Sequence, residues 1–588
     1  MKKIFIIAGA ALLLAIDGTG TFNRITTAMS SVSIEPKVDA RLAEFQEKLD
    51  DPELVGMGKA GRVNMVVGYD YANWTIIDGD DGLIVVDTGW FIERTKQALE
   101  DYREKNNNSK PIKAIILTHM HSDHIGGIEG LFEDGQFDGV DIYAHQDWQK
   151  QVQNDINAGP MLLRRGMSQM GFLLPYKDIE KGTFGAGIGR SALLGGTVSR
   201  TVKPTKFIDV DENTSKVAMT ILGVPMEFHY GPSDVDEQLL VWLPEDKVVL
   251  TGDAMGGTLP YVITPRHEPE RKSESFLYTF DTILGFDATD IIPGHGRPLR
   301  GKEDIESVIG ATYDVVSFLY DQVRRYVHKG YSADQIIDVL ELPARLANHP
   351  DLQPRYHTLD WLIRGLYSIE AGWVQNVNTL TQHSASEQAK RMIELVGETD
   401  LLLTGKQALI DEDYRWAISL AQIAIDADAS NEAAQKIMMG GLQGVAYTTD
   451  SSAERNYVLT ELGQLAGKVQ WDDIFTRVSS RLWKYRDADA TFNLFGRRFE
   501  SKDSFGQQFS IQFDVPNSGS YSFIVNDGVI RYQTTALAEA DAVVSIQLAS
   551  VRQIGSGQLS VEEALALDST KVTKGEQTAK KFAALIML

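Results

Sequence analysis

The chain has no cysteine in its 588 residues. This absence excludes disulfide bonds, thiolate ligands to a metal ion and a lipid anchor on a cysteine. Long hydrophobic runs are also scarce, and the run at the start, Ile4–Ile16, is too short to span a bilayer. This apolar run follows Lys2 and Lys3, so residues 1–30 are predicted to be a signal peptide for export to the periplasm or out of the cell. The alternative is an uncleaved anchor. No stable membrane span is expected elsewhere.

Basic residues are in the minority. Lys and Arg number 57 against 81 Asp and Glu, which gives a formal net charge of −24. So acidic a chain is not expected to bind nucleic acid, and it repels small anions at long range. An anionic substrate would therefore need cations placed locally at its binding site. The length exceeds that of one compact core and predicts two to four domains.

Residues 40–320 form the first predicted domain, in which short apolar runs alternate with loops and occasional helices. The runs at 74–77 and 83–86 flank Asp80-Asp81-Gly82 and predict a hairpin, and a helix is expected over 91–104. Three further runs, at 114–117, 248–250 and 291–292, end directly in residues of metal-ligand type. This pattern predicts a metal site at one edge of a sheet sandwich.

Two more domains are expected after it. Residues 321–465 have amphipathic helical spacing and no strand-like runs. Residues 468–588 return to strand patterns at 510–515, 521–525, 529–533 and 543–548, with the turn Asn526-Asp527-Gly528 and a helix over 561–567. The last segment is therefore predicted to be a small α+β domain.

A cluster of histidines directly follows the strand at 114–117. Since alternate residues leaving a strand point the same way, His119 and His121 can approach one metal ion, and Asp123 and His124 can face a second one. Imidazole nitrogen and carboxylate oxygen suit Zn²⁺ at about 2.0–2.2 Å. The alternative is a surface loop that happens to be rich in histidine.

Four local ligands cannot complete two metal sites, so others must come from elsewhere in the chain. Asp253 ends a strand and is a natural bridging carboxylate, His295 follows another strand and is a natural last ligand, and Asp234 can complete the first site. Alternatively, any of the three is a turn residue. Asp87 is expected either to orient a ligand histidine from behind or to cap a turn.

Taken in order, Asp87, the His-x-His-x-Asp-His cluster, Asp253 and His295 resemble the metallo-β-lactamase superfamily. A narrower resemblance, to the alkyl sulfatases that hydrolyse detergent-like sulfate esters, covers nearly the whole mature chain. It rests on residues 79–87, 185–189, 233–244, 346–350 and 372–373. The resemblance implies a metallo-β-lactamase αββα sandwich at 40–320, an all-α dimerisation domain at 321–465 and a homodimer. It also implies an α+β, sterol-carrier-like domain at 468–588 that handles alkyl chains.

Departures from the alkyl sulfatase pattern concern the substrate side. Where the family carries a His-Asn pair this chain has Pro260 and Tyr261, whereas the arginine that holds the sulfate is kept as Arg266. A surface ion pair is the alternative role for Arg266. Tyr261 or His267 can replace the missing proton donor, and either can instead be structural. Asp also replaces the family's Glu at positions 234 and 253, which shortens two ligands by a methylene.

The predicted function is hydrolysis of an amphiphilic alkyl sulfate ester to an alcohol and sulfate, with two zinc ions per chain bridged by Asp253. One alternative keeps the hydrolase but changes the ester to a lactone, a phosphodiester or a β-lactam. The other is a metal-binding scaffold without turnover. The glycines at 185, 187 and 189 do not match a dinucleotide-binding motif, and a flexible or tightly turned loop lining the substrate channel is expected there.

Overall fold

The computed structural model describes residues 34–175, 182, 184–191, 196–199, 202–254, 257–266, 271–471 and 487–587. The chain divides into two compact units, residues 1–469 and 470–588. The predicted signal peptide and His267 lie outside the described residues. Among the described helices, none has both the length and the apolar character needed to cross a membrane.

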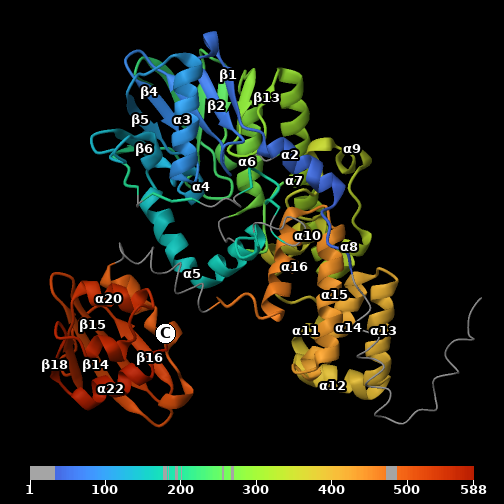
Figure 1. Ribbon diagram of the computed structural model, residues 1–588, viewed down its shortest axis with the longest axis vertical. Helices are drawn as coiled ribbons and strands as arrows, with labels where there is room; N and C mark the ends of the chain where they lie inside the picture. The colour runs from blue at the N-terminus through green and yellow to red at the C-terminus, as the bar shows by residue number, and fades with distance from the viewer. Residues whose placement is uncertain are drawn as a thin grey trace, which may run out of the picture. The chain divides into compact units, whose positions relative to one another are not determined.

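The described part of the first unit begins with a helix, α2 (Ala40–Asp50), which is followed by a seven-stranded sheet (Figure 1). In spatial order the strands are β1 (Glu53–Met57), β2 (Val63–Val67), β3 (Trp74–Asp78), β4 (Leu83–Val86), β5 (Ile112–Ile116), β6 (Asp141–His145) and β7 (Lys206–Ile208). Strands β1 to β4 are antiparallel neighbours, so the predicted hairpin is confirmed. The pairs from β4 to β7 are parallel, and α3 (Ile92–Asn106) connects β4 to β5.

A second sheet of six strands follows. Its order is β13 (Leu299–Arg300), β12 (Asp290–Ile292), β11 (Val248–Leu250), β10 (Leu239–Leu243), β9 (Val224–Tyr230) and β8 (Lys216–Ile221). All neighbours are antiparallel except β11 and β12. Because β11 and β12 run in parallel, their carboxyl ends lie at the same edge of the sheet.

The two sheets pack face to face, and helices cover their outer faces. Alternation along β4 shows this arrangement: Ile84 and Val86 belong to the core between the sheets, whereas Leu83 and Val85 pack with α3. A strand buried on both faces has to be apolar throughout, which explains the unbroken apolar runs in the sequence. The result is the predicted αββα sandwich.

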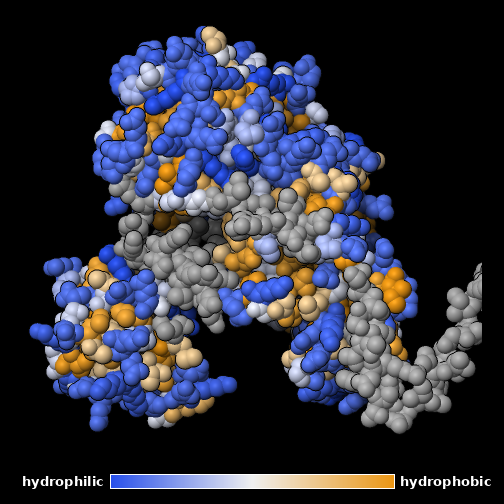
Figure 2. Space-filling view, viewed as in Figure 1, coloured by the Kyte–Doolittle hydropathy of each residue, from blue (hydrophilic) through white to orange (hydrophobic). Residues whose placement is uncertain are grey.

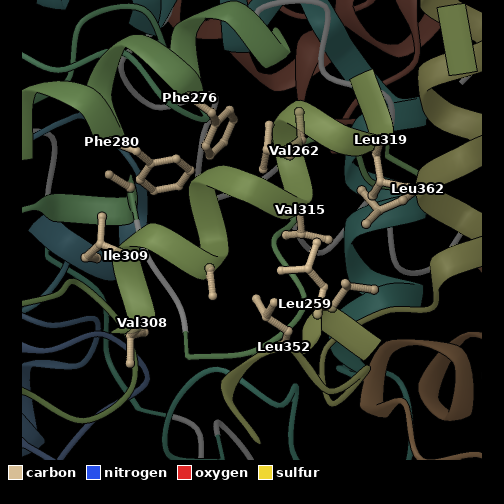
Figure 3. Close-up of a cluster of buried hydrophobic side chains, with 14 of the residues drawn as sticks. Leu259, Val262, Phe276, Phe280, Val308, Ile309, Val315, Leu319, Leu352 and Leu362 are labelled. Atoms are coloured by element: carbon tan, nitrogen blue, oxygen red, sulfur yellow. The ribbon is translucent and has the colours of Figure 1, made fainter. Parts of the chain in front are cut away.

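The outer face of the second sheet is covered by α6 (Ser273–Leu284) and α7 (Lys302–His328). Figure 3 shows this core, in which Phe280 of α6 lies near Ile309 of α7, and Phe276 of α6 belongs to the same cluster. Leu362 of the following helical region joins the same cluster. The sandwich and the helical region therefore share a continuous core.

Among the described residues, the helical region begins with a short helix, α8 (Ala333–Val339), and eight further helices follow it. They are α9 (Ala344–Ala347), α10 (Leu359–Ala371), α11 (Val377–Thr381), α12 (Ala385–Val396), α13 (Glu398–Ile410), α14 (Tyr414–Ala427), α15 (Glu432–Thr448) and α16 (Ser452–Leu465). Side chains of Asp413, Asn431 and Ser451 cap the first turns of α14, α15 and α16. Helices α13 to α15 share an apolar core of their own, and α16 packs on the long helix α5 (Trp148–Met170) of the sandwich.

The second unit is a five-stranded sheet with helices around an aromatic core. Its strands, in spatial order, are β16 (Val529–Gln533), β15 (Gly519–Asn526), β14 (Gln508–Val515), β17 (Ala542–Ser545) and β18 (Lys571–Lys574). Among its described residues, the helices are α18 (Ala488–Asn493), α19 (Phe495–Arg498), α20 (Leu548–Gly555), α21 (Val561–Leu565) and α22 (Glu576–Ala584). The strand predicted over 543–548 is wrong at its C-terminal end, because β17 ends at Ser545. Leu548 is instead the first residue of α20, since the apolar residues Val551 and Ile554 follow it at helical spacing.

Candidate metal centre

The histidine cluster lies where β5 ends. A one-turn helix, α4 (Ser122–Ile125), starts directly after His121 and directs Asp123 and His124 to the same side as the two preceding histidines. Nε2 of His119 and Nδ1 of His121 are 3.1 Å apart, as expected for two ligands of one ion.

Two remote aspartates complete a first group of possible ligands, His119, His121, Asp234 and Asp253. Oδ2 of Asp234 lies 3.1 Å from Nδ1 of His121. Oδ2 of Asp253 lies 3.7 Å from Nε2 of His119. The loop before β10 and the loop after β11 thus meet the histidine cluster from the second sheet.

Asp123, His124 and His295 form a second group. Nε2 of His295 is 3.3 Å from Oδ2 of Asp123. The other oxygen of Asp253, Oδ1, lies 3.0 Å from Nε2 of His124 and 3.4 Å from Nε2 of His295. One carboxylate oxygen of Asp253 therefore faces each group, which is the arrangement of a bridging ligand.

These spacings fit metal ions. Tetrahedral coordination with bonds of about 2.0–2.2 Å places ligand atoms about 3.3–3.6 Å apart, close to the separations given above. Five of the seven side chains are buried, and His121 and Asp123 are half-buried. Nε2 of His124 and Oδ1 of Asp253 are both buried and form no hydrogen bond of good geometry within the described residues. A cation between them would satisfy both atoms.

The charges in this cluster also suit a cation. Burial lowers the pKa of His119 to about 4, and His124 adds to the effect, so the imidazole is neutral and can act as a ligand. Burial opposes ionisation of Asp234, but His121 and then Arg271 lower its pKa to about 2. Burial also opposes protonation of His295, whereas Asp253 and Asp123 raise its pKa to about 9. Ionised carboxylates therefore face one another across the group and attract positive charge.

Asp87 orients the cluster from behind, as predicted. Its Oδ2 accepts a hydrogen bond from Nδ1 of His124 at 2.9 Å, and its two oxygens also accept the Thr118 amide and hydroxyl, each at 2.8 Å. The backbone of Asp87 has a φ of 57°, a left-handed conformation that Asp tolerates better than most residues. The turn after β4 thus fixes the Nε2 edge of His124 toward Asp253.

Three further residues position the ligand loops and were not predicted. The Tyr71 carbonyl lies 3.1 Å from Nδ1 of His295, and Asn73 Nδ2 donates to the carbonyls of Pro293 and Gly296 on either side of that histidine. Gln238 Oε1 accepts the Asp253 amide at 2.8 Å. Tyr71 and Asn73 lie more than 200 residues from the loop they hold, so no local sequence signal marks them.

Two family models match the chain. "Metallo-beta-lactamase superfamily" matches residues 67–295, and "Alkyl sulfatase dimerisation" matches residues 332–468. The linear primary-alkylsulfatase of Pseudomonas sp. (strain ATCC 19151) is 30% identical over 404 residues, which cover 68% of this chain and 74% of that protein. The chain belongs to the alkylsulfatase family of the metallo-β-lactamase superfamily.

Other alkylsulfatases agree with this assignment. An (R)-specific secondary-alkylsulfatase of Pseudomonas sp. is 26% identical over 530 residues, covering 87% of this chain and 77% of that protein. The structure of the stereoselective inverting sec-alkylsulfatase Pisa1 from Pseudomonas sp. superposes with a TM-score of 0.74 at 22% identity, over 96% of this chain and 89% of that one. This likeness confirms the predicted fold class, with a sandwich, an all-helical domain and a C-terminal α+β domain.

Of the three residues predicted on the substrate side of this alkylsulfatase, Tyr261 is buried at the metal centre. Its hydroxyl donates a 2.6 Å hydrogen bond to the carbonyl of Asp253. Burial raises the pKa of this hydroxyl well above its ordinary value, and the charges of Asp253 and Asp234 add to the effect. The structure thus places Tyr261 against the backbone of a candidate metal ligand, and its role as the proton donor stays a prediction.

Arg266 is half-buried, and its backbone amide and Nε both lie within hydrogen-bonding distance of Thr264 Oγ1, at 3.2 and 3.4 Å. Burial raises the pKa of the Tyr71 hydroxyl, and the positive charge of Arg266 acts in the opposite direction. Arg266 is therefore near the aromatic side chain that borders His295. Its predicted contact with sulfate stays a prediction, and so does any role of His267.

Aromatic side chains continue outward from the second ligand group. The ring of Tyr71 lies edge-on to His295 with centroids 5.1 Å apart, Trp90 lies 5.5 Å from Tyr71, and Phe172 lies 5.2 Å from Trp90. Phe172 is 39% exposed, whereas Tyr71 is buried. The series therefore leads from a candidate metal ligand to the protein surface.

The glycine-rich segment predicted to line the channel packs against this region. A Cβ atom at Gly189 would lie 1.7 Å from the carbonyl oxygen of Tyr71, and one at Gly187 would lie 2.2 Å from the carbonyl oxygen of Arg355. Gly187 also has a φ of 78°, which favours glycine. Ala186 and Ile188 between them are buried against Tyr71 and Tyr261. Close approach of neighbouring backbone accounts for Gly187 and Gly189, and the side chain of Gln46 occupies the place of a Cβ atom at Gly185.

Proposed function

We propose that the chain is a binuclear zinc hydrolase that cleaves alkyl sulfate esters to an alcohol and sulfate. The observation that carries the proposal is Asp253, which presents one oxygen to each of two ligand groups. Membership of the alkylsulfatase family supports the substrate class, because the relatives that cover most of the chain are named for it.

Zinc is the metal that we propose, with two ions per chain. The ligands are imidazole nitrogen and carboxylate oxygen, without thiolate, and their spacing suits tetrahedral coordination. When bound, such ions supply Lewis-acid chemistry that lowers the pKa of water toward about 7 and offsets the negative charge of a leaving group. Asp87, Tyr71 and Gln238 hold the ligands that would bind them.

The surroundings of the metal centre support an amphiphilic anion as the substrate. The rings of Tyr71, Trp90 and Phe172 provide an apolar surface from His295 outward, on which an alkyl chain can lie. Arg266 carries the positive charge proposed to hold the sulfate, since a guanidinium can donate two parallel hydrogen bonds to its oxygens. Such local cations are needed in a chain with a net charge of −24.

Turnover of a panel of esters tests this proposal. The purified protein should contain two zinc ions per chain by elemental analysis and should hydrolyse a medium-chain alkyl sulfate faster than the matching phosphodiester, lactone or β-lactam. Faster cleavage of one of those three would replace the sulfatase assignment with another hydrolase. Two bound ions without any turnover would support a metal-binding scaffold.

We further propose a homodimer formed through the helical region. Of the nineteen large apolar side chains exposed among the described residues, ten lie between Ile369 and Trp416, on or beside α10 to α14 (Figure 2). Val377 and Leu395 are 75% and 80% exposed. Clusters of this kind usually mark an interface, and the "Alkyl sulfatase dimerisation" model covers the same residues. Light scattering at micromolar concentration should give twice the mass of one chain, and a monomer would contradict the proposal.

We also propose that the protein is exported, on the basis of Lys2, Lys3 and the apolar run that follows. Cell fractionation with and without residues 1–30 tests this: the full chain should be found outside the cytoplasm, and the shortened chain inside it.

The C-terminal unit is proposed to be sterol-carrier-like and to bind alkyl chains. Its α+β fold around an aromatic core is compatible with that role.

A further inference from the structure

A buried arginine lies behind the first group of ligands. Arg271 is 1% exposed, and its Nη2 is 3.2 Å from Oδ2 of Asp234. Its Nη1 donates a 3.0 Å hydrogen bond to the backbone carbonyl of Tyr261. A buried guanidinium that reaches two acceptors is held in one orientation, because its planar shape fixes the directions of its donors.

Tyr261 extends this contact to the second carboxylate. Its hydroxyl donates to the carbonyl of Asp253, and its ring lies 5.4 Å from the guanidinium carbon of Arg271. Tyr261 therefore accepts a hydrogen bond from Arg271 with its backbone carbonyl and donates one to the carbonyl of Asp253 with its hydroxyl. Asp234, Arg271, Tyr261 and Asp253 form one continuous chain of contacts.

We propose that Arg271 and Tyr261 are positioning residues that set the separation of the two aspartate ligands and so determine whether the ion of the first group is bound. The inference rests on the proposed binuclear metal centre. Asp has one methylene, so a shift of its backbone moves its carboxylate directly, and a short ligand depends on how its loop is held. Arg271 holds the Asp234 carboxylate itself, and Tyr261 holds the backbone of Asp253.

Orientation and charge act in opposite directions at Arg271. Its positive charge by itself weakens the binding of a cation, whereas its contact with Asp234 prepares the carboxylate for that cation. Residues that orient metal ligands usually contribute about ten- to a hundredfold to metal affinity. We therefore expect orientation to be the larger effect, and replacement of Arg271 to weaken binding.

Stepwise zinc affinities test the inference. The metal-free parent protein would be titrated with Zn²⁺ against a chromophoric chelator, together with three variants, Arg271→Met, Arg271→Lys and Tyr261→Phe. His121→Ala would serve as the reference for loss of the first ion. Arg271→Met should weaken one of the two ions by roughly ten- to a hundredfold and leave the other unchanged, as in His121→Ala. Tyr261→Phe, which keeps the ring but loses the hydroxyl, should weaken the same ion by a smaller factor. Arg271→Lys should recover part of the loss, because it keeps the charge but cannot reach both acceptors.

A matched control separates positioning from general destabilisation. Arg62 pairs with the buried Asp246, which lies in the turn between β10 and β11, at the opposite end of β11 from Asp253, so Arg62→Met removes an ion pair to a buried carboxylate away from the ligand loops. It should lower the melting temperature without changing either zinc affinity. If Arg271→Met does not fold, Arg271→Lys and Tyr261→Phe still decide the matter. Unchanged or tighter binding of both ions in these variants would overturn the inference, whereas a parent that binds fewer than two ions would instead overturn the proposed metal centre.

Discussion

At the scale of single residues, the candidate metal centre depends on side chains that each have a defined partner. His124 is held by Asp87, His295 by the carbonyl of Tyr71, and Asp253 by Gln238 through its backbone amide. These contacts come from three different parts of the chain. A ligand oriented in this way loses little conformational entropy when it binds its ion.

Arg266 is the residue on which sulfate recognition is expected to depend. A charged hydrogen-bonded contact contributes about 1.5–3 kcal/mol, so Arg266→Ala should lower kcat/KM for an alkyl sulfate roughly ten- to a hundredfold. Zinc content should not change, because arginine is not a ligand. Arg266→Lys should recover only part of the activity, since lysine lacks the planar pair of donors. If Arg266→Ala cleaves the ester as fast as the parent, the sulfate is held elsewhere.

His357 is expected to make the protein sensitive to acid. It is completely buried, and burial together with the charge of Arg271 lowers its pKa from the ordinary 6.5 to about 4. The unfolded chain therefore takes up the proton first, and stability should fall as the pH drops from 6.5 to about 4. The difference corresponds to about 3 kcal/mol. Thermal melts across this range should show a smaller loss in His357→Gln than in the parent, whereas His328→Gln, at an exposed position, should match the parent.

At the scale of elements, three strands bring the candidate ligands together. β5 in one sheet and β11 and β12 in the other all end at the same edge of the sandwich, and their following loops carry His119 to His124, Asp253 and His295. The parallel pairing of β11 with β12 places the last two side by side. The glycine-rich segment 185–189 packs against Tyr71 beside this edge.

Substitution of Gly189 tests whether this segment must lie directly against the backbone of Tyr71. The Cβ of an alanine would lie 1.7 Å from the carbonyl oxygen of Tyr71, which also contacts His295. Gly189→Ala should therefore destabilise the protein by about 1–3 kcal/mol and weaken the binding of the ion that His295 is proposed to hold. Gly310→Ala is the control, because Gly310 lies in α7 with open space around it. It should be neutral or should stabilise the protein by up to about 1 kcal/mol in chemical denaturation. Equal effects of the two substitutions would contradict this account.

At the scale of the whole molecule, the chain consists of two units with separate cores. The first contains both the sandwich and the helical region, which share the core around α6, α7 and α10. Loss of the second unit should therefore leave the metal centre intact.

Truncation after Lys468 tests the role of the second unit. The shortened protein should fold and bind as many zinc ions as the parent, because every candidate ligand belongs to the first unit. If the C-terminal unit handles alkyl chains, kcat/KM should fall more for a long-chain sulfate than for a short-chain one. An equal fall for both chain lengths would mean that this unit contributes only to stability.

The sequence by itself determined the kinds of element and the set of candidate ligands. Unbroken apolar runs predicted strands such as β4 and β5. The spacing within residues 119–124 predicted the cluster of candidate ligands. Both signals are local in the sequence. Only the tertiary structure decided which oxygen of Asp253 faces which group, and that Tyr261 contacts a backbone carbonyl. It alone also brought Arg271 to Asp234 and Asn73 to the loop of His295. These contacts join residues from 8 to 220 positions apart through two packed sheets, and such distances follow from how the layers pack rather than from any local pattern.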